Sequence, residues 1–294
     1  MKPVWLRRKA SDLKAMQKMW DLLQRHKLNT VCQGALCPNQ GDCFERGTAT
    51  FLILGHTCTR NCTFCAIPTQ EHPPAPDPTE PVRIAQAVAE LELKHVVITS
   101  VTRDDLEDGG AQYFAETVQA LKEKDSRTVV EVLIPDFQGS FSALKRVVES
   151  DPDIINHNLE TVPRLYPEVR PQADYWRSLE LLGRVREIAP NKATKSGLML
   201  GLGETREEVR RAMADLREVS CDLLTLGQYL QPSGRHHPVM DYLPPEEFEE
   251  HRRSGEAMGF KAVFSAPLVR SSFHAAEVFE KTKRSEGEKE IQKD

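Results

Sequence analysis

A chain of 294 residues, 39% of them hydrophobic, is long enough to bury a sizeable core in one large α/β domain or in two smaller ones. Its formal net charge of −5 and its dispersed lysines and arginines argue against a nucleic-acid partner bound by bulk electrostatics. No run approaches the about 18 apolar residues that a membrane span requires, and no signal-peptide core follows the start. We therefore expect a cytoplasmic protein without a membrane or nucleic-acid partner.

The first 49 residues lie outside any regular alternation of strands and helices. Their basic start is soon followed by Asp12 and Asp21, which favours an amphipathic helix over a transit peptide. The apolar stripe expected on this helix consists of Leu13, Met16, Met19, Trp20 and Leu23. Six of the seven cysteines lie between residues 32 and 65, and such crowding indicates metal binding rather than a secreted disulfide framework.

From residue 50 onward, short apolar runs alternate with helical patterns. The runs are rich in Val, Ile and Leu and nearly continuous, as is typical of strands buried on both faces. We expect strands at 50–56, 95–100, 129–135, 153–158, 194–200, 222–229 and 261–267. We expect helices at about 81–93, 110–124, 140–150, 175–189, 206–219 and 245–258. Strands that alternate with helices in this way predict parallel βαβ units with right-handed crossovers.

Either a doubly wound open sheet or a full or partial (β/α) barrel satisfies this pattern. We favour the barrel, because polar residues gather where the strands end and a barrel brings these ends to one mouth. The expected fold class is α/β, with a partial (β/α)6 barrel over residues 50–267. Residues 1–49 form an N-terminal extension, and residues 268–294 form a C-terminal extension whose charged tail, "KTKRSEGEKEIQKD", we expect to be disordered.

The loop after the first barrel strand carries Cys58, Cys62 and Cys65 in the spacing C-x3-C-x2-C. Structural zinc sites close with four ligands and commonly use paired C-x2-C elements, which this spacing does not match. Thiolates also bind iron–sulfur cubanes, normally through four cysteines. Three cysteines on one loop therefore hold three irons and leave the fourth iron open to a small molecule, which is typical of a working metal site.

A second group of cysteines precedes that strand. Cys32, Cys37 and Cys43 have the spacing C-x4-C-x5-C, in a segment rich in turn-forming Pro and Gly. We interpret them as ligands of a second iron–sulfur cluster, rather than as a structural metal site or small buried hydrophobes. The sequence leaves its fourth ligand open between Cys221, water, substrate and an oxygen side chain. Cys221, at the start of an apolar run, is more typical of a core residue.

The cysteine loop resembles that of the radical S-adenosylmethionine superfamily, whose C-x3-C-x-aromatic-C form is matched by Phe64 next to Cys65. This resemblance implies that the open iron binds the amino and carboxylate groups of S-adenosyl-L-methionine. With both cysteine groups, the match narrows to the lipoyl synthase family over about residues 28–277. The segments that carry it are "NTVCQGALCPNQGDCF", "GTATFLILGHTCTRNCTFCAI", "HVVITSVTRDDLEDGGA", "EVLIPDFQG", "NHNLETVPRLY", "TKSGLMLGLGET", "LLTLGQYLQPSG" and "VRSSFHA".

The resemblance implies that the second serine of the R-S-S motif, Ser272, completes the auxiliary 4Fe-4S cluster on Cys32, Cys37 and Cys43. From the residues alone, "RSSFHA" reads as a helix start with Ser271 or Ser272 as N-cap. The chain departs from the family pattern at three places, none of which removes a ligand. Gln33 and Gly34 stand where the family usually has acidic residues, and Phe273 stands where it usually has tyrosine.

The family resemblance further implies the reaction of a radical sulfurtransferase. Two sulfur atoms from the auxiliary cluster are inserted at carbons 6 and 8 of an octanoyl chain, which a lysine of a lipoyl carrier domain holds. The carriers implied are 2-oxoacid dehydrogenase E2 subunits and the glycine cleavage H protein. An electron donor such as ferredoxin or flavodoxin and an iron–sulfur carrier that rebuilds the cluster are also implied.

Four polar residues at strand ends are candidate contacts for S-adenosyl-L-methionine. Asn158 and Glu160 lie in a segment that resembles the ribose-binding segment of related sulfur-inserting enzymes. The alternative is a purely structural role, in which Asn158 caps a turn. Lys195 would be costly to bury unpaired, so we expect it to meet the cofactor carboxylate; the alternative is a lysine that reaches solvent or pairs structurally. Gln228 is a similar candidate. His236 and His237 are expected on a solvated loop.

Three rival functions remain at this stage. A radical methylthiotransferase also has two clusters, but those that act on RNA carry a C-terminal nucleic-acid module. A biotin-synthase-like enzyme would place the ligands of its second cluster inside the barrel strands. A non-catalytic iron–sulfur carrier would have little use for six βα units and a polar barrel mouth.

Overall fold

The computed structural model describes residues 3–6, 13–35, 37, 39–45 and 50–272. Its centre is one eight-stranded sheet in which the strands follow one another in chain order, β1 to β8. β1 is antiparallel to β2, and every later neighbour pair is parallel. The strands are β1 Asn29–Thr30, β2 Thr50–Ile53, β3 His95–Ser100, β4 Val129–Leu133, β5 Ile154–Asn156, β6 Ala193–Leu200, β7 Leu223–Gln228 and β8 Ala262–Ser265.

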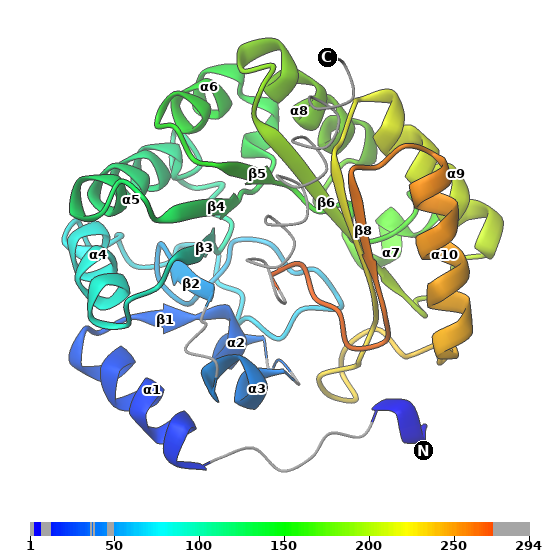
Figure 1. Cartoon of the computed structure of the whole chain (residues 1–294), viewed down its shortest axis with the longest axis horizontal. Helices are drawn as coiled ribbons and strands as arrows, with labels where there is room; N and C mark the ends of the chain where they lie inside the picture. The colour runs from blue at the N-terminus through cyan, green and yellow to red at the C-terminus, as the bar shows by residue number, and fades with distance from the viewer. Residues whose placement is uncertain (1–2, 7–12, 36, 38, 46–49, 273–294) are drawn as a thin grey trace, which may run out of the picture.

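The sequential strand order confirms a barrel rather than a doubly wound sheet. In a doubly wound sheet the order reverses at a switch point, whereas here each crossover from β2 to β8 steps in the same direction. The order ends at β1 and β8, and no pairing between these two is found among the described strands. The barrel is therefore partial, with six βα units and a seventh parallel strand (Figure 1).

The helices lie around the outside of the ring of strands (Figure 1). Six of them follow strands β2 to β7 and confirm the predicted positions: α4 Glu80–Glu90, α5 Ala111–Lys124, α6 Phe141–Glu149, α8 Tyr175–Ile188, α9 Arg206–Glu218 and α10 Pro245–Ala257. Local sequence explains their starts. Thr205 and Glu208 form a capping box at α9, and the Ser140 and Asp174 side chains cap α6 and α8. The short helices are α7 Tyr166–Val169 and the 3-10 turns Val4–Leu6, Phe137–Gly139 and Pro163–Leu165.

Three helices precede the barrel: α1 Leu13–Arg25, α2 Val31–Gly34 and α3 Gln40–Glu45. On α1, Met19 and Leu23 are buried in the core, and Met16 and Trp20 pack partly buried against it, as the predicted stripe requires. The side chain of Leu13 lies outside the described part. α2 and α3 lie beside the cysteine loop that follows β2 (Figure 1).

The segment after β8 turns back into the centre of the ring (Figure 1). Backbone bonds tie it to β7, since Ala266 N donates to Leu226 O and Gln228 N donates to Pro267 O. At Gly227 strand β7 and this segment are in contact, and a Cβ there would lie 2.0 Å from the Val269 oxygen. Only glycine permits this approach. Phe273 and the charged tail lie outside the described residues.

Candidate metal and cofactor site

The loop after β2 is pinned so that its cysteine sulfurs meet hydrogen-bond donors. The Cys58 Sγ accepts backbone N–H groups of Arg60 at 3.4 Å and of Thr102 at 3.3 Å. Arg60, between the first two cysteines, is 6% exposed and binds both Asp104 and Asp136 at 2.6 Å. Backbone donors favour the thiolate form of sulfur, so this loop suits a cationic metal group.

Burial sets the protonation of the other two cysteines. It raises the pKa of Cys65 to about 12 and raises that of Cys62 as well, although the Arg170 guanidinium opposes the change at Cys62. Without a metal these thiols hold their protons at neutral pH. A metal group that binds them displaces the protons, and its own charge compensates the buried thiolates.

The earlier cysteines are placed by α2 and α3. The Thr30 hydroxyl caps α2 by accepting the Gln33 N–H, and Cys32 on this helix is buried. Cys37 and Cys43 are partly buried against the core. Burial raises the pKa of Cys32 to about 11, opposed by hydrogen bonds with Thr50. All seven cysteines lie in the described residues and none forms a disulfide bond, so the six in this region can act as thiolate ligands.

One cavity of about 350 Å³ is lined by all three cysteines of the first group and by Cys65 of the second. This convergence brings together residues that the sequence places up to 240 positions apart. The predicted site residues that line the cavity are Cys32, Cys37, Cys43, Phe64, Cys65, Asn158, Glu160, Gln228 and Ser272. Cys58, Cys62 and Lys195 are not part of its lining.

Ser272 reaches the cavity beside the first group of cysteines. Its hydroxyl accepts a hydrogen bond of 2.8 Å from Thr50, the residue that also bonds Cys32. Ser271 and Ser272 lie in a turn at the end of the described chain. The helix start that these residues indicate by themselves falls beyond residue 272, outside the described part.

Asn158 and Glu160 form a hydrogen-bonded pair at 3.0 Å after β5. Gly197 makes room for them, because a Cβ there would lie 3.0 Å from Asn158 Oδ1 and 2.6 Å from Thr225 Oγ1. Burial raises the pKa of Glu160, opposed by the charge of Arg170 and the bond from Asn158. An amide and a carboxylate at a cavity wall can grip the vicinal hydroxyls of a sugar.

Comparisons with known proteins agree with this geometry. Residues 52–216 match the Radical SAM superfamily. Lipoyl synthase of Alkaliphilus metalliredigens is 55% identical over 280 residues, which cover 95% of this chain and 96% of that protein. Lipoyl synthase of Trichlorobacter lovleyi is 56% identical over 275 residues, 94% of this chain and 97% of the other.

The chain belongs to the lipoyl synthase family. Its cofactors are accordingly S-adenosyl-L-methionine and 4Fe-4S clusters, and its two groups of three cysteines fit two clusters. Solved structures share the fold at low identity. HydG, a maturase of the FeFe-hydrogenase, is 15% identical with a TM-score of 0.58 over 87% of this chain and 57% of its own. SuiB of Streptococcus suis bound to S-adenosylmethionine is 14% identical with a TM-score of 0.54 over 74% and 49%.

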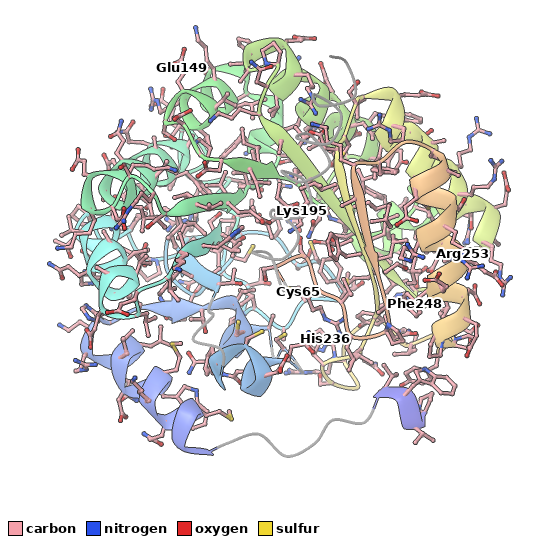
Figure 2. The ribbon with its side chains drawn as sticks, viewed as in Figure 1. Cys65, Glu149, Lys195, His236, Phe248 and Arg253 are labelled. Atoms are coloured by element: carbon pink, nitrogen blue, oxygen red, sulfur yellow. The ribbon has the colours of Figure 1, made fainter. Side chains whose placement is uncertain are left out.

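Lys195 is absent from the lining of the cavity and forms a structural ion pair, one of the two positions expected for it. Lys195 and Glu131 are both fully buried, and the ammonium donates to the carboxylate at 2.9 Å. The structural alternative for Lys195 therefore describes its position, since a buried ammonium must pair with an anion. In the view of Figure 2, Lys195 and Cys65 lie inside the ring, whereas Glu149 and Arg253 lie at its periphery.

Gln228 lines the cavity, but its amide is already bonded. Its Nε2 donates to the carbonyls of Leu200, Tyr229 and Asp241, and its Oε1 accepts the Leu243 N–H. Gln228 thus fastens the loop after β7 to the barrel. The N–H donors of the Gln228 amide are therefore engaged within the protein, and only a lone pair of its Oε1 remains for another partner.

The structure also differs from the prediction that His237 lies on a solvated loop. His237 is 6% exposed, its Nε2 bonds the Leu202 carbonyl at 2.8 Å, and its backbone N–H donates to Thr63 on the cysteine loop. The expectation of a solvated pair is therefore wrong for His237, which joins two loops at the barrel mouth. His236 is half-buried. No local pattern distinguishes the two, because the difference depends on the path of the loop.

Two absences apply to the described residues only. No group of three or more His, Cys, Asp or Glu side chains there is arranged to hold a single metal ion. No helix in that part of the chain is long and apolar enough to cross a membrane.

Cys221 is fully buried just before β7 and does not line the cavity, and burial raises its pKa to about 12.

Proposed function

We propose that this chain inserts two sulfur atoms into a protein-bound octanoyl chain, the reaction that its family resemblance implies. The observation that carries the proposal is the shared cavity, which is lined by all three cysteines of the first group and by Cys65 of the second. A radical made at one cluster is short-lived, so it requires its sulfur source within the same enclosed space. Membership of the lipoyl synthase family supports the same reaction.

The residues divide into two ligand sets in this proposal. Cys58, Cys62 and Cys65 hold the cluster that binds S-adenosyl-L-methionine. When bound, the clusters and S-adenosyl-L-methionine supply the electron, the adenosyl radical and the sulfur atoms. The auxiliary cluster is held by Cys32, Cys37, Cys43 and Ser272.

In this proposal the remaining cavity residues bind the cofactor and keep water out of the cavity. Asn158 and Glu160 grip the ribose hydroxyls, and Phe64 packs against the cofactor next to the last cysteine of the loop. Leu133, Leu198 and Met199 give the cavity an apolar wall. An apolar wall suits an aliphatic substrate and excludes the water that would quench a radical.

The division of the chain follows this assignment. Residues 1–49 supply the cysteines of the auxiliary cluster, residues 50–267 the barrel, and residues 268–294 the serine ligand. The substrates proposed are octanoylated carrier domains, which include E2 subunits of 2-oxoacid dehydrogenases and the glycine cleavage H protein. A ferredoxin or flavodoxin as electron donor, an iron–sulfur carrier and a cytoplasmic location complete the proposal.

Anaerobic reconstitution tests it. The wild-type chain should bind about eight irons, the Cys58→Ala, Cys62→Ala, Cys65→Ala variant about four, and Cys221→Ala about eight. With reductant, S-adenosyl-L-methionine and an octanoyl-lysine peptide, mass spectrometry should detect two added sulfur atoms and release of 5′-deoxyadenosine. Iron without 5′-deoxyadenosine would indicate a carrier, and an added methylthio group would indicate a methylthiotransferase. A single zinc would overturn the proposal.

A further inference from the structure

A buried ion pair anchors a line of hydrogen bonds that runs through the barrel interior. Lys195 on β6 and Asn156 on β5 both donate to the same Glu131 oxygen, at 2.9 Å and 3.0 Å. All three residues are fully buried. Because the carboxylate is held by an ammonium, it fixes the Asn156 amide with its NH₂ group toward Glu131.

The line continues into the C-terminal segment through Ser271. The Asn156 Nδ2 donates to the Ser271 hydroxyl at 2.9 Å, and that hydroxyl donates to the Asn158 Oδ1 at 2.9 Å. A hydroxyl has one proton, so the bond from Asn156 leaves this proton for Asn158. The Asn158 Oδ1 is thereby turned toward Ser271, and its Nδ2 toward Glu160 at 3.0 Å.

Ser271 therefore lies between two parts of the proposed site. The next residue, Ser272, lies in the cavity with Cys32 and the other auxiliary-cluster cysteines. On the other side, the Ser271 hydroxyl sets the orientation of the amide proposed to contact the ribose. Thr50 bonds the Ser272 hydroxyl and Cys32, which both belong to the first of these two parts.

We propose that Ser271 is a positioning residue that couples the serine ligand of the auxiliary cluster to the Asn158–Glu160 pair. This inference rests on the proposed function. Without the Ser271 hydroxyl, the Asn158 Oδ1 loses its donor and the amide is free to rotate away from Glu160. The segment that carries Ser272 loses its link to the anchored Asn156 at the same time.

The test uses the full-length, anaerobically reconstituted protein and two readouts other than turnover. One is equilibrium binding of radiolabelled S-adenosyl-L-methionine, and the other is the rate at which a chelator removes iron. Ser271→Ala should weaken binding about tenfold and speed iron loss about tenfold, as expected for a lost bond to a buried acceptor. Ser271→Thr keeps the hydroxyl and should retain both wild-type values.

Two further variants separate coupling from simple loosening. Thr50→Val should speed iron loss and leave binding of S-adenosyl-L-methionine unchanged, because the bonds that it removes, to Ser272 and Cys32, both lie in the auxiliary-cluster part. Asn156→Leu removes the donor to Ser271 without altering the C-terminal segment, and it should reproduce both effects of Ser271→Ala. Circular dichroism confirms that each variant is folded.

The outcomes distinguish this inference from the proposed function. If Ser271→Ala changes only one of the two readouts, or neither, while the wild type holds two clusters and binds S-adenosyl-L-methionine, the coupling is overturned and the function stands. If Ser271→Thr behaves like Ser271→Ala, the hydroxyl is not the coupling group and the inference also fails. A wild type with one cluster overturns both.

Discussion

Thr50 and Ser272 are 222 residues apart in the chain, and the Thr50 hydroxyl donates a hydrogen bond of 2.8 Å to that of Ser272. Thr50 begins β2, which pairs with β1, and β1 leads directly into α2, the helix that carries Cys32. The bond therefore joins the N-terminal cysteine segment to the C-terminal serine. The proposed auxiliary-cluster site is therefore assembled from the segments before and after the barrel, which meet at the first residue of β2.

Replacement of Thr50 by valine should lower the free energy of unfolding of the metal-free protein by about 1 kcal/mol. Valine has nearly the same shape but cannot donate to Ser272 or bond Cys32. Urea denaturation measures the difference. Thr50→Ser keeps the hydroxyl and serves as the control; equal stability of the valine variant and the wild type would contradict the prediction.

Gly227→Ala should displace the C-terminal segment, because the new Cβ would lie 2.0 Å from the Val269 oxygen. We expect at least a tenfold loss of the proposed activity and faster hydrogen exchange in residues 266–272. Gly234→Ala is the matched control, since a Cβ at Gly234 meets nothing within 4 Å. Wild-type exchange in Gly227→Ala would show that β7 and this segment can separate without cost.

Lys195→Met should destabilise the protein by about 3 to 5 kcal/mol, the range for a buried ion pair that loses one partner. The cause is the Glu131 carboxylate, which stays buried without its ammonium. The double variant Lys195→Met, Glu131→Leu removes both charges and should recover much of the loss in urea denaturation. A single variant as stable as the wild type would show that water reaches Glu131.

Stability should fall in acid because two buried carboxylates are ion-paired. Burial favours a higher pKa, but Lys195 and His95 hold that of Glu131 at about 2, and Arg60 holds that of Asp136 at about 2. Both values lie below those of the unfolded chain, so the stabilisation is present above about pH 4.5 and is lost toward pH 2.

For each unit by which the native pKa lies below the unfolded pKa, such a group adds about 1.4 kcal/mol to the free energy of unfolding at neutral pH. Urea denaturation at pH 7, 5, 4 and 3 measures the slope. Asp136→Asn, which cannot titrate at this position, should show a shallower decline. Constant stability from pH 5 to pH 3 would argue against both ion pairs.

His237→Ala should loosen the barrel mouth, whereas His236→Ala should not. Truncation of His237 removes the bond to the Leu202 carbonyl and leaves a gap beneath the loop after β7. We expect about 1 to 3 kcal/mol lower stability and faster proteolysis within residues 230–243. Equal proteolysis of the two alanine variants would mean that the backbone bond of His237 to Thr63 suffices.

The periodic part of the fold could be predicted from the sequence because its causes are local. Buried parallel strands need continuous Val, Ile and Leu runs, and helices such as α9 begin at recognisable N-cap residues. Strand bounds such as His95–Ser100 and helix bounds such as Ala111–Lys124 differ from the predictions by a residue or less. The cysteine spacings likewise predict both ligand groups, since the spacing of cysteines on a short loop is a local property.

Pairing between polar residues of distant segments was decided by tertiary structure alone. Lys195 pairs with a carboxylate 64 residues away, His237 reaches Leu202 35 residues away, and Asn156 meets Ser271 across 115 residues. Such partners depend on strand register and on the path of each loop, neither of which leaves a pattern along the chain. The sequence by itself predicts which cysteines bind metal, while the partial barrel decides which polar side chains are already paired with one another.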